Sequence, residues 1–215
     1  MDIVEILGLA PVMPVVTIAD PRQAGALARA LAAGGLRAIE VTLRTPAALE
    51  AIAAIASEAP EALPGVGTAL TPKHLEEAAK AGARFAVSPG ATPTLLDAAR
   101  SGPLPYLPAI ATASELMAAM ERDYSTFKFF PAAACGGPAA LKALAGPFPD
   151  ARFCPTGGID AESAPAYLAL TNVLCVGGSW VVPAPAVARG DFAEIEQLAR
   201  AAAGLKKPSR GTSGP

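Results

Sequence analysis

The sequence repeats one pattern eight times: a short run of β-branched and aromatic residues, a turn, and a longer segment rich in alanine and leucine. The repeats follow at a spacing of about 25 residues with short connections, which indicates β-α units whose strands lie parallel in one sheet. The predicted strands are 14–19, 38–43, 63–67, 85–88, 104–108, 126–130, 152–155 and 173–176. The predicted helices begin near 24, 47, 73, 92, 112, 138, 161, 179 and 192.

Eight such units favour a closed (β/α)8 TIM barrel, a compact single-domain fold of the α/β class. A doubly wound open sheet is the alternative, but it requires a glycine-rich turn after the first strand, and residues 19–22 (Ala-Asp-Pro-Arg) contain no glycine. We therefore predict one barrel domain over residues 1–205. Residues 206–215 are polar and rich in lysine, glycine and proline, so we expect a flexible C-terminal tail there.

Composition excludes several classes of function. The net charge is −2 and no basic cluster occurs before residue 206, which argues against a nucleic-acid or membrane partner. The three cysteines are far apart and form no Cys-x-x-Cys pair, as expected in a reducing compartment. Acidic residues stand where a signal peptide would carry positive charge, and every long apolar run is interrupted. These features predict a cytoplasmic protein.

One lysine stands within an apolar strand. Lys128 lies in the run Ser-Thr-Phe-Lys-Phe-Phe-Pro at residues 125–131, and strand alternation places it on one face with Thr126 and Phe130. Burying an ammonium group is costly, whereas an apolar setting favours the neutral amine that attacks carbonyl carbons. A lysine that reaches out to solvent at a sheet edge is the alternative interpretation.

A second polar face occurs in the strand at 38–43. Alternation places Glu40, Thr42 and Arg44 together, with the carboxylate deep in the barrel and the guanidinium at its rim. A structural ion pair between Glu40 and Arg44 is possible, but buried pairs contribute little to stability. A lysine and a glutamate inside one barrel supply an amine nucleophile and a proton-transfer partner, which suits carbonyl chemistry through an imine.

Glycine-rich turns follow the last two strands, at 156–159 and 177–180. The loops after strands seven and eight commonly bind phosphate in these barrels, because glycine lets backbone amides approach an anion. The turns at 67–68 and 88–90 also follow strands, and either line the same opening or are ordinary loops. His74, the only histidine, is expected at the surface, and Cys154 is expected to be a small core residue.

Together these segments resemble the 2-keto-3-deoxy-6-phosphogluconate (KDPG) and 4-hydroxy-2-oxoglutarate (KHG) aldolase family, over about residues 10–203. The resemblance is carried by the following segments: 34–45, 65–68, 88–90, 127–132, 152–159 and 176–180. It implies a class I aldolase that cleaves KDPG to pyruvate and D-glyceraldehyde 3-phosphate, and KHG to pyruvate and glyoxylate. It further implies a homotrimer with no metal and no organic cofactor, acting on small keto acids in the Entner–Doudoroff pathway.

The resemblance also implies roles for individual residues. Lys128 matches the Schiff-base lysine, Glu40 the general acid/base, and Arg44 and Thr68 the residues that hold the pyruvate carboxylate. The remaining matches are two pocket walls and the phosphate-side loops: Pro89, Phe130, Gly157, Gly158, Gly178 and Ser179. Ala133 departs from the family pattern, in which we expect an acid, and this departure bears on substrate preference.

Three alternatives remain at the level of sequence. A sibling aldolase would use the same lysine with a different aldehyde. A phosphate-binding barrel isomerase or synthase would use Lys128 only as a cation. A catalytically silent barrel would sense phosphorylated metabolites, although a sensor has no need of an amine nucleophile.

Overall fold

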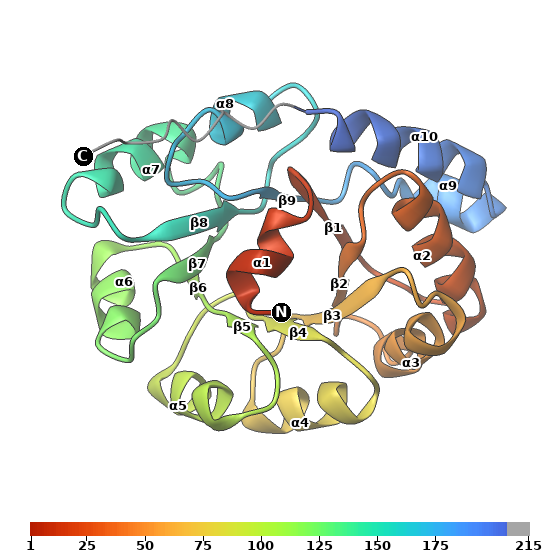
Figure 1. The fold of residues 1–215 in the computed structure, drawn as a ribbon, viewed down its shortest axis with the longest axis horizontal. Helices are drawn as coiled ribbons and strands as arrows, with labels where there is room; N and C mark the ends of the chain where they lie inside the picture. Colours follow the sequence, from red (N-terminus) through yellow and green to blue (C-terminus); the bar gives the residue numbers. More distant parts are fainter. Residues whose placement is uncertain (206–215) are drawn as a thin grey trace.

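The strands curl into a parallel ring that is surrounded by helices (Figure 1). The structure, a computed structural model, describes residues 1–205, so the predicted tail at 206–215 lies outside the described residues. The strands are β1 (Val12–Val16), β2 (Ala38–Thr42), β3 (Leu63–Gly67), β4 (Phe85–Val87), β5 (Tyr106–Leu107), β6 (Ala109–Ile110), β7 (Thr126–Phe129), β8 (Arg152–Pro155) and β9 (Val176–Gly178).

These strands close into a barrel with eight positions. One sheet has the order β5-β4-β3-β2-β1-β9 and the other the order β6-β7-β8. β5 and β6 are separated only by Pro108, which has no N–H to donate to a ladder, so together they fill one position that joins the two sheets. On the other side, single parallel bridges join Phe153 to Val173 and Thr156 to Gly177. The predicted (β/α)8 barrel is confirmed.

The helices are α1 (Ile3–Gly8), α2 (Ala24–Ala33), α3 (Ala48–Glu58), α4 (Pro72–Lys80), α5 (Pro93–Ser101), α6 (Ala113–Met120), α7 (Gly137–Ala145), α8 (Ala164–Leu168), α9 (Ala184–Arg189) and α10 (Phe192–Ala203), with a 3-10 turn, η1, at Pro21–Gln23. Threonine caps begin three of them: the hydroxyls of Thr71, Thr92 and Thr112 each accept a backbone N–H of the first turn. These starts agree with the sequence to within one residue.

Three strand predictions were displaced, and the strand predicted at 104–108 is observed as β5 and β6, which extend from Tyr106 to Ile110. β1 begins and ends earlier than predicted, because its first residues pair with β9 and its last two pair with β2. β9 lies later than predicted, since Gly177 and Gly178 pair with Met13 and Pro14. Glycine has a low strand propensity, so the sequence indicated only a turn there. The helices α8 and α9 are also shorter than predicted, and α9 begins five residues after Ser179.

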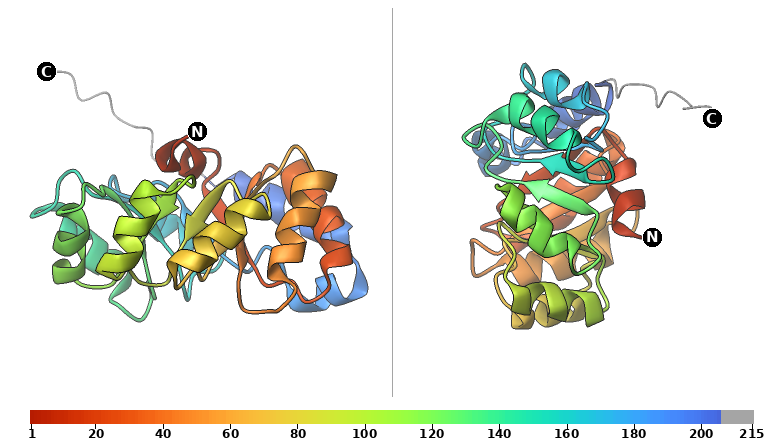
Figure 2. Two further views of the ribbon diagram at one scale, coloured as in Figure 1. Left: turned by 90° about the horizontal axis from the view of Figure 1, so that it is seen from below. Right: turned by 90° about the vertical axis from the view of Figure 1, so that its left-hand side faces the viewer.

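Helix α1 was not predicted, and it closes one end of the barrel. Figure 1 shows it across the centre of the ring, and Figure 2 shows it standing out from one face. The side chain of Asp2 accepts the N–H of Glu5, and the Glu5 side chain accepts the N–H of Asp2. Ile6 and Leu7 are buried in an apolar cluster with the following residues: Met13, Ala38, Phe85, Val87, Leu107, Cys154, Leu174 and Cys175. Because α1 precedes β1, this is the end at which the strands begin.

Candidate active site

The centre of the barrel holds a buried ion pair between Lys128 of β7 and Glu40 of β2. Lys128 Nζ lies 2.9 Å from Glu40 Oε1 and 3.2 Å from Oε2. The side chains are only 5% and 1% exposed, respectively. The sequence predicted both residues inside the barrel, and the structure brings them together across 88 positions of the chain. The alternative of a pair between Glu40 and Arg44 is wrong, because Glu40 pairs with the lysine.

Small residues on the neighbouring strands make room for this pair. Lys128 stands opposite Ala109 of β6 and Cys154 of β8 in the strand register. On β3, a Cβ added to Gly67 would lie 2.5 Å from Glu40 Oε1, and a Cβ added to Gly65 would overlap the ring of Phe85. The absence of a side chain at Gly67 therefore leaves room for the carboxylate of Glu40, and its absence at Gly65 leaves room for the phenyl ring of Phe85.

An aromatic wall stands beside the lysine. The centroid of the Phe130 ring lies 5.4 Å from Lys128 Nζ, within the range of a cation–π contact. A Cβ added to Gly157 would lie 3.2 Å from the same ring, so the first glycine loop packs against Phe130. The predicted wall residue thus contacts both the amine and the loop after β8.

The two glycine loops lie side by side at the end of the barrel where the strands finish. The bridge between Thr156 and Gly177 joins their bases. Gly157 and Gly158 have φ angles of 100° and 71°, which glycine adopts without steric cost. Ala133 packs against the second of these glycines, since a Cβ there would lie 2.7 Å from the Ala133 methyl. In the second loop, Gly178 lies under the Trp180 ring.

The remaining predicted residues lie at the same barrel end, and within residues 1–205 none of their side chains forms a hydrogen bond or ion pair with Lys128 or Glu40. Thr68 follows β3 with a φ of 61°, a strained conformation for a β-branched residue. Pro89 is half-buried beyond β4, and Ser179 is exposed. Arg44 lies in the turn after β2, one residue past the predicted strand end, and its side chain is exposed at the rim.

Sequence reasoning missed Thr156 and Gly67 as parts of the site. Thr156 is buried, and a Cβ on Gly177 would overlap its hydroxyl, so it faces the barrel interior two residues beyond Cys154. Its position in the alternation of β8 was a usable signal. The spacing of Gly65 and Gly67 was also usable, because glycines at i and i+2 leave one strand face open.

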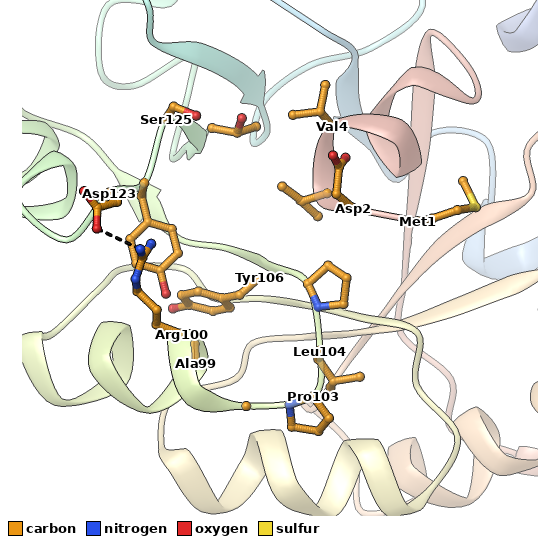
Figure 3. A pocket seen from close by; sticks show the side chains of 15 residues that line it. Met1, Asp2, Val4, Ala99, Arg100, Pro103, Leu104, Tyr106, Asp123 and Ser125 are labelled. Atoms are coloured by element: carbon orange, nitrogen blue, oxygen red, sulfur yellow. Dashed lines mark hydrogen bonds and ion pairs between the residues drawn. The ribbon is translucent and has the colours of Figure 1, made fainter.

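A hollow of about 550 Å³ lies at the opposite end of the barrel, between α1, the 102–105 loop and the start of β7 (Figure 3). Several of its polar groups are paired: Arg100 binds Asp123 at 2.7 Å, and the Tyr124 hydroxyl donates to the Leu96 carbonyl. Burial raises the pKa of Tyr106 and of Tyr124, so both phenols are neutral. The hollow therefore offers little reactive chemistry.

The histidine and the cysteines take no part in the ion pair. His74 is half-buried, and its Nδ1 accepts the N–H of Leu70. Cys154 and Cys175 are buried, with their sulfur atoms 3.5 Å apart. Within residues 1–205, no group of three or more His, Cys, Asp or Glu side chains is arranged to hold a metal ion. In the same region, no helix has the length and apolar character needed to cross a membrane.

Comparison with known proteins identifies the family. The family model for KDPG and KHG aldolase matches residues 3–198. This chain belongs to that family. It is 54% identical over 197 residues to the KHG/KDPG aldolase of Escherichia coli K12, covering 92% of each chain. The KDPG aldolase structure from Zymomonas mobilis superposes with a TM-score of 0.91 at 49% identity, covering 96% of this chain and 98% of that one.

A second solved relative is the KDPG aldolase of Legionella pneumophila, with pyruvate captured as a covalent carbinolamine intermediate. It is 45% identical and superposes with a TM-score of 0.91, covering 93% of this chain and 97% of that chain.

Proposed function

We propose that this chain is a class I aldolase that cleaves KDPG to pyruvate and D-glyceraldehyde 3-phosphate. We propose that it also cleaves KHG to pyruvate and glyoxylate. The observation that carries this proposal is the buried contact of Lys128 Nζ with both carboxylate oxygens of Glu40. An amine held in a desolvated barrel beside one base has the two groups that imine formation requires.

The first half of the reaction forms the imine. Glu40 takes a proton from Lys128, and the neutral amine attacks the C2 ketone of the substrate to give a carbinolamine. Glu40 returns this proton to the carbinolamine hydroxyl, which leaves as water, so a protonated imine forms and Glu40 is again a carboxylate. The cation–π contact with Phe130 lies next to this developing positive charge. The Legionella relative with pyruvate held as a carbinolamine supports this course.

The second half breaks the C3–C4 bond. Glu40, acting through a bound water, removes the proton of the C4 hydroxyl, and the bonding electrons move into the imine to form an enamine. The aldehyde leaves, the enamine is protonated at C3, and hydrolysis releases pyruvate and the free lysine. Each proton given up by the substrate returns to it or to water, so no external oxidant or reductant is required.

The other predicted residues bind the substrate in this proposal. Arg44 and Thr68 hold the carboxylate of the keto acid, which orients C2 toward the amine. Pro89 and Phe130 form walls. Backbone amides of the adjoining glycine loops, Gly157-Gly158 and Gly178-Ser179, bind the phosphate, and the positive φ angles of Gly157 and Gly158 are of the kind found in anion-binding turns. The close packing of Ala133 on Gly158 leaves the first loop without an added negative charge at that contact.

Assembly as a homotrimer and a place in the Entner–Doudoroff pathway rest on family resemblance alone, and a cytoplasmic location rests on the widely spaced cysteines. We include them in the proposal on that basis. The two rivals without an imine, a barrel isomerase and a silent sensor, leave the buried amine–carboxylate contact without a chemical role. A sibling aldolase with a different aldehyde is distinguished by its substrate.

Trapping of the imine tests the proposal directly. The protein is incubated with pyruvate and sodium borohydride and analysed by intact and peptide mass spectrometry. We expect one reduced pyruvate adduct on the peptide that contains Lys128. Lys128→Ala is expected to lose both the adduct and the cleavage activity, whereas Lys142→Ala, at an exposed lysine of α7, keeps both. A folded protein without an adduct, or an adduct that persists in Lys128→Ala, would overturn the assignment.

A separate measurement identifies the aldehyde. Cleavage rates of KDPG and KHG are compared under the same conditions, with pyruvate as the common product. A preference for the phosphorylated substrate supports the glycine-loop assignment. Equal values of kcat/KM for the two substrates would contradict that assignment and leave the imine chemistry untouched.

A further inference from the structure

The direction in which the Arg44 side chain extends depends on the backbone of the turn that carries it. The residue lies in the turn between β2 and α3, and its side chain is exposed. Among residues 1–205, its guanidinium forms no ion pair with another side chain. A long side chain without a partner keeps its rotamer freedom, so its base must be fixed if the guanidinium is to meet a carboxylate at one place.

A hydroxyl pair fixes the chain just before Arg44. Thr42 is fully buried, and its hydroxyl donates to the Val16 carbonyl at 3.0 Å. The Thr42 oxygen also lies 2.8 Å from the hydroxyl oxygen of Thr17. A hydroxyl has only one proton, so Thr17 is the donor in this second bond. The end of β2 is thereby tied to the end of β1.

A second hydroxyl fixes the chain just after Arg44. Thr45 donates to the Ile18 carbonyl at 2.6 Å, and this carbonyl lies beyond the end of β1. On the other side of the turn, the N–H of Leu43 donates to the Gly67 carbonyl of β3 at 2.9 Å. Arg44 is therefore flanked on both sides by residues that are anchored to its two neighbouring strands.

We propose that Thr42 and Thr45 are positioning residues for Arg44, holding its turn so that the guanidinium meets the carboxylate of the keto acid. This inference rests on the proposed carboxylate-binding role of Arg44. The carboxylate is present both in the substrate and in the transition state. Loss of the anchor therefore weakens both states equally, raising KM with little change in kcat.

The test is a matched set of substitutions at position 45, assayed by pyruvate release from KDPG. Thr45→Val keeps the shape and removes the hydroxyl, and we expect KM to rise about tenfold with kcat changed by less than about twofold. Thr45→Ser retains the hydroxyl and is expected to restore KM to within about twofold of the original value. If Thr45→Val leaves KM unchanged, or if Thr45→Ser does not rescue it, the proposal is wrong.

Two more variants separate positioning from general destabilisation. Thr42→Val removes the first anchor and is expected to raise KM in the same way. Asn172→Ala removes a buried side-chain bond to the Leu141 carbonyl, at 2.9 Å, in the connection that leads to β9. It should lower the melting temperature without raising KM. A rise in KM for Asn172→Ala equal to that for Thr45→Val would assign the effect to lost stability and overturn the proposal.

Arg44→Gln distinguishes this inference from the function on which it rests. We expect it to raise KM at least as much as Thr45→Val does, and we expect Thr45→Val to add little in the double variant. An unchanged KM in Arg44→Gln would remove the carboxylate-binding role itself. A raised KM in Arg44→Gln together with a normal KM in Thr45→Val would leave that role intact and refute only the anchor.

Discussion

The two ends of this barrel are built from different types of residue. Towards the end where the strands finish, a buried charge pair lies in the barrel interior, and two glycine loops and a threonine with a left-handed backbone lie at the rim. Where the strands begin, Ile6 and Leu7 of α1 pack on apolar side chains of the barrel interior. One end thus holds groups that are costly to bury, and the other consists of groups that gain from burial. The contrast assigns chemistry to the first end and stability to the second.

A loss of base at the reactive end gives the largest expected effect. Glu40→Gln keeps the size of the side chain and removes the base, so we expect kcat to fall by about 1,000-fold. Steady-state kinetics measures the change, and Glu50→Gln on the exposed face of α3 is the control. A fall of less than about tenfold would show that Glu40 is not the proton-transfer group.

Substitutions at two glycines of β3 test where along this strand the reactive part of the barrel gives way to the apolar cluster. Gly67→Ala pushes a methyl group against Glu40, so we expect kcat/KM to fall by about 100-fold. Gly65→Ala pushes against Phe85 in the apolar cluster, so we expect a loss of about 1–3 kcal/mol in the free energy of unfolding and a much smaller change in kcat/KM.

Kinetics at low temperature and urea unfolding, run on both glycine variants, measure the two effects separately. Equal losses of activity in Gly65→Ala and Gly67→Ala would mean that the reactive end and the apolar end of the barrel do not act independently.

A truncation in α1 tests the stabilising end. Leu7 is 1% exposed, and Leu7→Ala should lower the free energy of unfolding by about 2–5 kcal/mol. Activity per folded molecule should stay within about twofold, because no reacting group is involved. Val4→Ala on the same helix is the control, since Val4 is exposed. Equal effects of the two variants in urea titrations would contradict the proposal that α1 stabilises the barrel by closing this end.

The smallest effect concerns pH and the start of α6. The N–H of Ala111, which donates to the Glu115 carboxylate, is the main cause that lowers the pKa of this group. A lowered folded-state pKa adds stability above the unfolded value, and this stability is lost as pH falls through the folded value. The melting temperatures of the protein and of Glu115→Gln should therefore differ more at pH 7 than at pH 3. A constant difference would exclude this linkage.

The barrel and its charged pair could be predicted because both follow from periodicity. Repeated β-α units specify a ring, and strand alternation places Glu40 and Lys128 inside it. The helix α1 could not be predicted, because six residues carry little periodic signal and the helix is stabilised by burial of Ile6 and Leu7 in the cluster. The strand at Gly177 and Gly178 owes its existence to its partner β1.

The hydrogen bonds of Thr42 and Thr45 that flank Arg44 could not be predicted from the sequence either. Thr42 could be placed on the inner face of β2, but its acceptor, the Val16 carbonyl, belongs to a different strand. Thr45 donates to a carbonyl 27 positions earlier, in a loop without periodicity. Contacts of this kind depend on how strand ends are staggered around the ring, and only the folded chain specifies that stagger.

The position of α1 also bears on how the barrel is made. Ile6 and Leu7 leave the ribosome well before Leu174 and Cys175, which belong to the same apolar cluster. Synthesis proceeds from the N-terminus, so the apolar face of α1 is not fully covered until Leu174 and Cys175 have been synthesised. During that interval its apolar face is open to chaperones and to neighbouring nascent chains.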